Sequence, residues 1–201
     1  MSSDFTIFLV DDDPAVLKSL SRLVQAAGYE TKAYLSAETF LSEHDPSAPG
    51  CAVLDLAMPQ LNGLHVQQAL AQEGNNRPVI FLTGQGSIQE SVKAMKAGAT
   101  DFLTKPVDKS ELLRAIKLAE ERDRAQRHNE ARHNIIIEKM AKLTRRERET
   151  LKLMAEGLLN KQIACVMGVT ERTIKVHRGR VFKKMGARNV VELVRMTAEH
   201  L

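Results

Sequence analysis

The stretch 6-TIFLVDDDP-14 joins a short apolar run to three adjacent aspartates. The apolar run lacks the polar alternation of a half-exposed strand, and it therefore predicts a strand that is covered on both faces of a sheet. Asp13 precedes Pro14, an arrangement typical of a helix N-cap followed by the first helical residue. Asp11 and Asp12 need another explanation, because neighbouring carboxylates repel each other and are costly to bury.

The same unit, a short apolar run followed by a helical pattern, recurs along the first 120 residues. Together with residues 5–10, the predicted strands are 29–34, 51–55, 78–82 and 101–104. The predicted helices are 14–27, 37–44, 63–73, 87–97 and a segment that starts at 108. Five such units predict an α/β domain in which helices cover both faces of a parallel sheet. We expect the flavodoxin-like (βα)5 arrangement with strand order 2-1-3-4-5.

Charged and polar residues stand where the predicted strands end. Asp55 ends the third strand, Thr83 follows the fourth, and Lys105 follows the fifth. In parallel α/β sheets, ligands bind outside the carboxyl ends of the strands, so we expect these side chains to meet Asp11 and Asp12. A hard divalent cation such as Mg2+ prefers oxygen ligands and would offset the repulsion between the carboxylates. The sequence therefore predicts an Mg2+ site at this edge of the sheet.

Charge is divided unevenly along the chain. Residues 1–120 contain 15 acidic and 10 basic side chains, whereas residues 121–201 contain 10 acidic and 19 basic ones. The basic part is a candidate for binding nucleic acid, whose phosphates dominate such affinities. No run approaches the roughly 20 apolar residues of a membrane span, and the first residues lack a signal-peptide pattern. With two cysteines in unrelated contexts, we expect a cytoplasmic protein without a disulfide framework.

A polar, helix-favouring segment separates the acidic part from the basic one. A heptad register through this segment is apolar at its ends and polar in its middle, which argues against a strong coiled coil. A solvated helical linker fits the pattern better. We therefore expect a first domain, a linker and a second domain at residues 1–120, 121–141 and 142–201.

The C-terminal domain has the pattern of several short helices. Thr144 and Glu147 have the spacing of a capping box at the start of the first helix. Asn160 is expected to cap the second helix, which Gly168 ends, and Thr170 is expected to cap the third. Two helices joined by a tight turn that contains glycine are typical of a helix-turn-helix unit.

The first domain closely resembles the receiver domain of bacterial two-component response regulators. The residues that carry the resemblance are Asp11, Asp12, 54-LDLAMP-59, Thr83 and 102-FLTKP-106. The resemblance implies that Asp55 accepts a phosphoryl group from a histidine kinase, a reaction in which positioning and charge neutralisation matter most. It also implies an Mg2+ site made by Asp11, Asp12, Asp55 and the backbone carbonyl of Ala57.

Three further roles follow from this resemblance. Thr83 and Lys105 are expected to bind oxygens of the phosphoryl group, and a cis bond before Pro106 would aim the lysine. Movement of Thr83 toward the phosphate would open space for the ring of Phe102, which makes these two residues a switch. Simple core packing is the alternative role for Phe102.

The segment 143-LTRRERETLKLMAEGLLNKQIACVMGVTERTIKVHRGRVFKKMG-186 closely resembles the LuxR-type helix-turn-helix. Both domains together resemble a response regulator of the NarL/FixJ class, nearest to FixJ-like members. A helical wheel places Ile174, Val181 and Met185 on one face, which we expect to be core. The residues expected to contact DNA are Lys161, Thr173, Lys175, Val176, His177, Arg178, Arg180, Lys183 and Lys184.

The expected function is that of a transcription factor activated by phosphorylation, which dimerises and binds double-stranded promoter DNA. It would not be an enzyme, although it could catalyse its own dephosphorylation, and RNA polymerase is a further possible partner. One alternative is a phosphohydrolase with an aspartyl-phosphate intermediate. Such enzymes usually carry a second acid two residues after the nucleophile, where this chain has Ala57. The other alternative is an output domain that binds RNA or protein.

Overall fold

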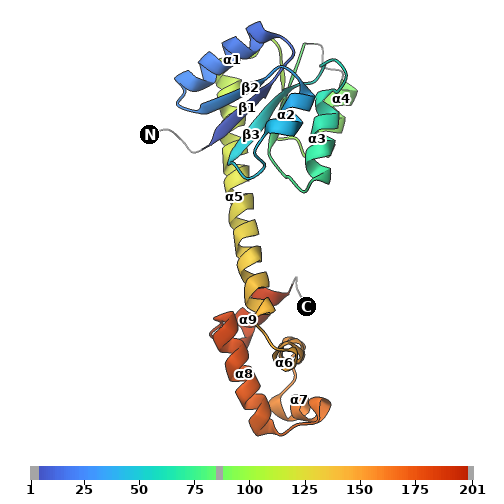
Figure 1. Ribbon diagram of the computed structural model, residues 1–201, viewed down its shortest axis with the longest axis vertical. Coiled ribbons are helices and arrows are strands. Elements are labelled where there is room, and N and C mark those ends of the chain that lie inside the picture. The colour runs from blue at the N-terminus through green and yellow to red at the C-terminus, as the bar shows by residue number, and fades with distance from the viewer. Residues whose placement is uncertain (1–4, 85–87, 199–201) are drawn as a thin grey trace. The chain divides into compact units, whose positions relative to one another are not determined.

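The computed structural model describes residues 5–84 and 88–198 (Figure 1). The chain divides into two compact units, Met1–Arg127 and His128–Leu201, and each is described by itself. The long helix α5, Lys109–Ala141, belongs in part to both units and contains the segment 121–141 that we expect to be a linker. None of the helices within the described ranges is long and apolar enough to cross a membrane.

The N-terminal unit is built on a five-stranded parallel sheet. The strands are β1 (Thr6–Val10), β2 (Glu30–Tyr34), β3 (Gly50–Asp55), β4 (Val79–Thr83) and β5 (Asp101–Thr104). Their order in the sheet is β2-β1-β3-β4-β5, which confirms the flavodoxin-like arrangement. Four helices besides α5 connect them: α1 (Pro14–Ala26), α2 (Ala37–Glu43), α3 (Gly63–Gln72) and α4 (Ile88–Lys96).

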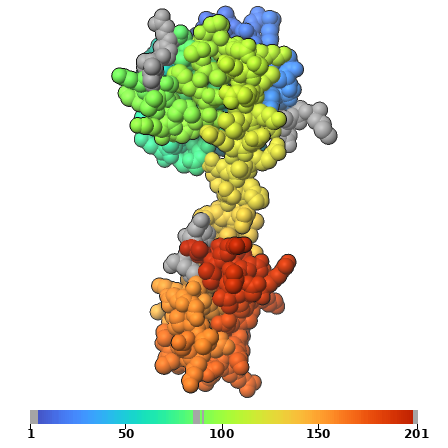
Figure 2. Space-filling view, turned by 180° about the vertical axis from the view of Figure 1, so that it is seen from behind, coloured from blue at the N-terminus to red at the C-terminus, as the bar shows by residue number. Residues whose placement is uncertain are grey.

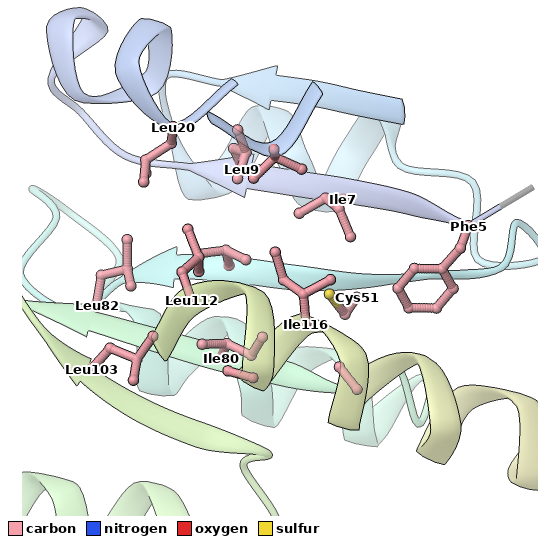
Figure 3. Packing of buried hydrophobic residues seen from close by; sticks show 14 of the residues in the cluster. Phe5, Ile7, Leu9, Leu20, Cys51, Ile80, Leu82, Leu103, Leu112 and Ile116 are labelled. Carbon is pink, nitrogen blue, oxygen red and sulfur yellow. The ribbon is translucent and has the colours of Figure 1, made fainter. Parts of the chain in front are cut away.

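Two hydrophobic clusters cover the two faces of this sheet. Alternate residues of β1 divide between them: Ile7 and Leu9 lie in the cluster under α1 and α5, whereas Phe8 and Val10 lie under α2 and α3. In Figure 3, side chains from the strands point toward those of α5, among them Leu112 and Ile116. Each fully buried side chain of this size contributes roughly 1.5–3 kcal/mol to folding. The apolar strands therefore leave only their ends for polar chemistry.

Capping residues hold the helices where the sequence predicts. The Asp13 carboxylate accepts a hydrogen bond of 2.8 Å from the backbone N–H of Ala15, so Asp13 caps α1. Asn62 caps α3 in the same way, and the Asp108 carboxylate accepts from the N–H of Glu111 at the start of α5. The starts of α1, α3 and α5 are thus fixed in the loops that follow β1, β3 and β5.

The C-terminal unit is helical and has its own core. Its helices after α5 are α6 (Arg145–Ala155), α7 (Asn160–Met167), α8 (Glu171–Met185) and α9 (Val190–Thr197). The capping box of Thr144 and Glu147 at α6 is confirmed. The expected cap at Asn160 is wrong: Leu159 precedes α7, and its N–H donates to the side-chain oxygen of Gln162 at 2.7 Å. Gly168, in the left-handed conformation, ends α7 and makes the turn into α8.

Candidate functional site

Three carboxylates meet at the carboxyl edge of the sheet. Asp11 and Asp12 follow β1, and Asp55 is the last residue of β3, the strand that pairs with β1. One carboxylate oxygen from each lies within 4.8 Å of the others. Asp11 and Asp55 are 1% and 5% exposed, whereas Asp12 is open to solvent. The result is a largely buried acidic group with one exposed member.

Lys105, which follows β5, brings a positive charge into this acidic group. Its Nζ lies 2.6 Å from Oδ2 of Asp11 and 2.9 Å from Oδ1 of Asp55. Burial raises the pKa of Asp11, although the hydrogen bond from Lys105 works against that increase. Burial also disfavours the charged lysine, but its hydrogen bonds to the two carboxylates outweigh burial and raise the pKa of Lys105. The peptide bond between Lys105 and Pro106 is cis.

The other residues expected at this site come from the neighbouring strand ends. Thr83 ends β4 and is 2% exposed, and its carbonyl accepts a hydrogen bond of 2.6 Å from the N–H of Lys105. Ala57 lies two residues after Asp55 and is exposed. Phe102 of β5 is half-buried, with its ring centroid 6.3 Å from that of Phe81.

The donor set suits a hard divalent cation. Three carboxylates offer only oxygen ligands, and Mg2+ needs one or two of these while it keeps several waters. The exposed side chain of Asp12 gives a hydrated ion access from solvent. The ammonium of Lys105 contacts two of these carboxylates, so it places a positive charge directly beside Asp55. The arrangement fits the binding of an anionic group beside Asp55.

A second candidate surface lies on α8 of the C-terminal unit. Ile174, Val181 and Met185 are fully buried, as the helical wheel predicts. The opposite face exposes Lys175 and Val176, the latter 48% exposed. Of the other residues expected to contact DNA, three are exposed: Lys161 on α7 and Arg180 and Lys183 on α8. Thr173 and Arg178 are half-buried.

Comparison with known proteins assigns each part of the chain to a family. Residues 7–117 match the "Response regulator receiver domain" family, and residues 141–197 match the family "Bacterial regulatory proteins, luxR family". The chain belongs to the response regulators. It is 43% identical over 191 residues to response regulator protein TodT of Pseudomonas putida, an alignment that covers 95% of this chain and 84% of TodT.

Two further similarities extend over nearly the whole chain. Transcriptional regulatory protein FixJ of Azorhizobium caulinodans is 37% identical over 196 residues, which cover 98% of this chain and 93% of FixJ. The structure of response regulator StyR matches with a TM-score of 0.86 and 36% identity, over 98% of this chain and all of StyR. This response regulator therefore combines a receiver domain with a LuxR-type DNA-binding domain.

Two residues of α8 in this response regulator, Lys184 and His177, are partly buried. Lys184, expected to contact phosphate, donates to the buried carboxylate of Glu147 at 2.6 Å and to the carbonyl of Lys142 at 3.0 Å. Its ammonium is therefore engaged within the domain. His177 is half-buried, and its Nδ1 is buried without a hydrogen-bond partner among the described residues. Sequence position alone could not distinguish these side chains from the exposed cations around them.

The sequence interpretation missed two contributors to the receiver site. The backbone N–H of Asp13 donates to Oδ1 of Asp11 at 3.0 Å, which orients this carboxylate. Gly63 lets α3 start against the site, because a Cβ there would lie 2.7 Å from the carbonyl oxygen of Asp55 and 2.9 Å from the ring of Phe81. The available signal was the pair Asn62-Gly63, a helix cap followed by a residue with no side chain.

Proposed function

We propose that a sensor histidine kinase phosphorylates Asp55 and that this modification controls sequence-specific binding of promoter DNA. The observation that carries the proposal is the meeting of three carboxylates with the ammonium of Lys105 at one edge of the sheet. Phosphoryl transfer to a carboxylate requires a nucleophile, charge neutralisation and orientation of the transferred group. Asp55 would be the nucleophile, the neighbouring carboxylates would hold a neutralising cation, and Lys105 would orient the transferred group.

In the proposed transfer, a carboxylate oxygen of Asp55 forms a bond to phosphorus while the bond from phosphorus to the kinase's histidine nitrogen breaks. The electron pair of the broken bond stays on that nitrogen. Asp11, Asp12, Asp55 and the carbonyl oxygen of Ala57 would hold Mg2+, which neutralises charge on the phosphoryl oxygens when bound. Lys105 would bind one of these oxygens and Thr83 would donate its hydroxyl hydrogen to another.

The same group of residues would switch the surface of the receiver. As the Thr83 hydroxyl moves toward the phosphoryl group, it would leave space for the ring of Phe102 behind it. Figure 2 shows the face over α4, β5 and the first part of α5, coloured green to yellow. Val92 and Met95 on α4 are 45% and 46% exposed on the receiver surface. We propose that this face forms a homodimer after phosphorylation.

In the C-terminal domain, α8 would lie in the major groove of DNA. Lys175 and Val176 would face bases, where the valine methyl groups can contact the methyl group of thymine. Gly179 has no side chain with which to contact a base. Arg178 or Arg180 would therefore supply the additional sequence preference. Thr173, His177 and Lys161 would contact phosphates, which position the helix without specifying sequence. Two half-sites would then lie about one helical turn apart in the dimer.

The proposed organisation is a receiver at 1–120, a helical linker at 121–141 and a DNA-binding domain at 142–201. The protein would work in the cytoplasm, where its kinase and promoter are both accessible, and RNA polymerase is a further proposed partner. Its only reaction would be to accept the phosphoryl group and to lose it slowly to water.

The test is a gel-shift assay with the full chain, with and without an acyl-phosphate donor and Mg2+. We expect the donor to increase the affinity of the wild-type protein for duplex promoter DNA, and to have no effect on Asp55→Asn. Equal stimulation of the Asp55→Asn variant would refute the assignment of the phosphorylated residue. RNA of the same sequence, tested in parallel, separates a DNA-binding domain from an RNA-binding one.

A further inference from the structure

The end of the receiver sheet opposite Asp55 carries a network of charged residues that the proposed phosphorylation does not use. It lies around the loop 44–49, which leads into β3, and the loop 73–78, which leads into β4. Both loops precede their strands, so they lie at the amino ends of the strands. α5 passes this edge of the sheet before it continues past Arg127.

Arg127 of α5 makes three polar contacts there. Its Nε donates to Oδ2 of Asp123, one helical turn earlier, at 2.8 Å. Its Nη1 and Nη2 donate to the backbone carbonyls of Ser47 and Ala48, both at 2.7 Å. Asp123 is 5% exposed and the side chain of Arg127 is 34% exposed, so the pair is only partly open to solvent. Hydrogen bonds to charged groups contribute more to stability than neutral ones.

Arg77 holds the same loop from the other side. It is 6% exposed, its guanidinium carbon lies 4.1 Å above the centroid of the Phe8 ring, and its Nη2 donates to the carbonyl of Asp45 at 2.7 Å. The backbone N–H of Arg77 donates to Asn75, whose side-chain nitrogen contacts Nε2 of His44 at 3.0 Å. Two guanidinium groups therefore fix three carbonyls of a single loop.

Other contacts show that α5 is held by the receiver up to Arg127. The hydroxyl of Tyr29 donates to Glu120 at 3.3 Å, and Arg122 donates to the carbonyl of Ala99 at 3.4 Å. Beyond Arg127, residues 128–135 are all exposed. Arg127 is also the last residue of the N-terminal unit, so its two hydrogen bonds to the loop lie where α5 leaves the receiver.

We propose that Arg127, oriented by Asp123, is a positioning residue that sets the rotation of α5 about its own axis where the helix leaves the receiver. It would thereby couple phosphorylation at Asp55 to DNA binding, because α5 is the covalent connection to the DNA-binding domain. This inference rests on the proposed function. The planar guanidinium suits this role, because it bonds two successive carbonyls and one carboxylate at fixed angles, which an ammonium cannot do.

The test compares Arg127→Gln and Arg127→Lys with Arg124→Gln in the full chain. Arg124 is a matched control, because it lies on the same helix and pairs with Glu120, but its side chain is 79% exposed and is not hydrogen-bonded to the loop in the described part of the chain. The first readout is the ratio of DNA affinities with and without acyl phosphate and Mg2+. The second is the fraction of Asp55 that becomes phosphorylated, and the third is amide hydrogen exchange in residues 44–49 and 117–127.

We expect all variants to accept phosphate to the wild-type extent, since Asp55 lies at the other end of the sheet. Arg127→Gln and Arg127→Lys should speed exchange in both segments and lower the affinity ratio by about threefold or more, whereas Arg124→Gln should match the wild type. The inference would be overturned if the affinity ratios of Arg127→Gln and Arg124→Gln differed by less than threefold. If the affinity ratio of the wild-type protein is 1, phosphorylation does not control DNA binding. That result would refute the proposed function and, with it, this inference.

Discussion

Replacing Glu147 by glutamine is expected to destabilise the C-terminal unit by about 2 kcal/mol at neutral pH. Glu147 is 2% exposed, and its carboxylate accepts hydrogen bonds from the N–H of Thr144 at 2.9 Å and from Lys184 at 2.6 Å. Glutamine keeps an oxygen for Thr144 but places no charge opposite Lys184. A hydrogen bond to a charged group contributes about 1.5–3 kcal/mol, and water partly compensates Lys184, which is 34% exposed.

The pH dependence of this effect follows from the pKa of Glu147. The hydrogen bond from Lys184, together with that from the Thr144 N–H, lowers this pKa from 4.5 to about 2. Because the folded state has the lower pKa, the stabilisation is complete above the unfolded value of 4.5 and is lost as the pH falls toward 2. The difference between wild type and Glu147→Gln should therefore be constant near neutrality and shrink below pH 4.5.

The assay is amide hydrogen exchange within α6 of the full chain, measured at increasing urea, because the two units need not unfold together. Glu149→Gln is the matched control: Glu149 is on the same helix and pairs with Arg146, but both side chains are exposed. We expect the control to change stability by no more than about 0.5 kcal/mol. Equal stability of the two variants, or a difference that stays constant down to pH 3, would refute the reasoning.

Three further predictions concern the receiver and α8. Asp12→Ala should abolish Mg2+ binding in isothermal titration calorimetry while the urea midpoint hardly changes, because this side chain is exposed. Gln60→Gly should raise the urea midpoint of the receiver. Gln60 has a φ of 66° in a tight turn, which is closed by a hydrogen bond of 2.8 Å from the N–H of Leu61 to the carbonyl of Pro59. This conformation costs a non-glycine residue about 1 kcal/mol. Lys175→Ala should weaken binding to promoter DNA by about 1–3 kcal/mol and reduce the preference for promoter over unrelated DNA, both measured by fluorescence anisotropy, because Lys175 is proposed to face bases.

The strands and helices of the receiver could be predicted because their signals are local, whereas the strand order had to be chosen among a few arrangements. Apolar runs without alternation, the cap at Asp13, and right-handed crossovers leave few arrangements of five βα units. The position of Asp55 beside Asp11 followed from the strand order, since the two carboxylates end neighbouring strands. The residues of the site were thus predictable as a set, although their hydrogen bonds were not.

Contacts between distant parts of the chain could not be predicted from local sequence patterns. Nothing near Lys184 distinguishes it from Lys183, yet only the former reaches a buried carboxylate 37 positions away. Arg127 lies in a polar segment that suggests a solvated linker, but the carbonyls that it binds come from a loop about 80 residues earlier. The cap at Asn160 failed for a different reason, since Gln162 supplies the capping oxygen from within the helix.

The most direct test of the account is to locate the phosphoryl group after the full chain is treated with an acyl phosphate. Borohydride reduction of the acyl phosphate, followed by peptide mass spectrometry, marks the modified residue. We predict one modification, on Asp55, that requires Mg2+ and is absent from Asp55→Asn. Modification of Asp11 or Asp12 instead, or modification of Asp55 that proceeds equally well without Mg2+, would contradict the assignment of this edge of the sheet.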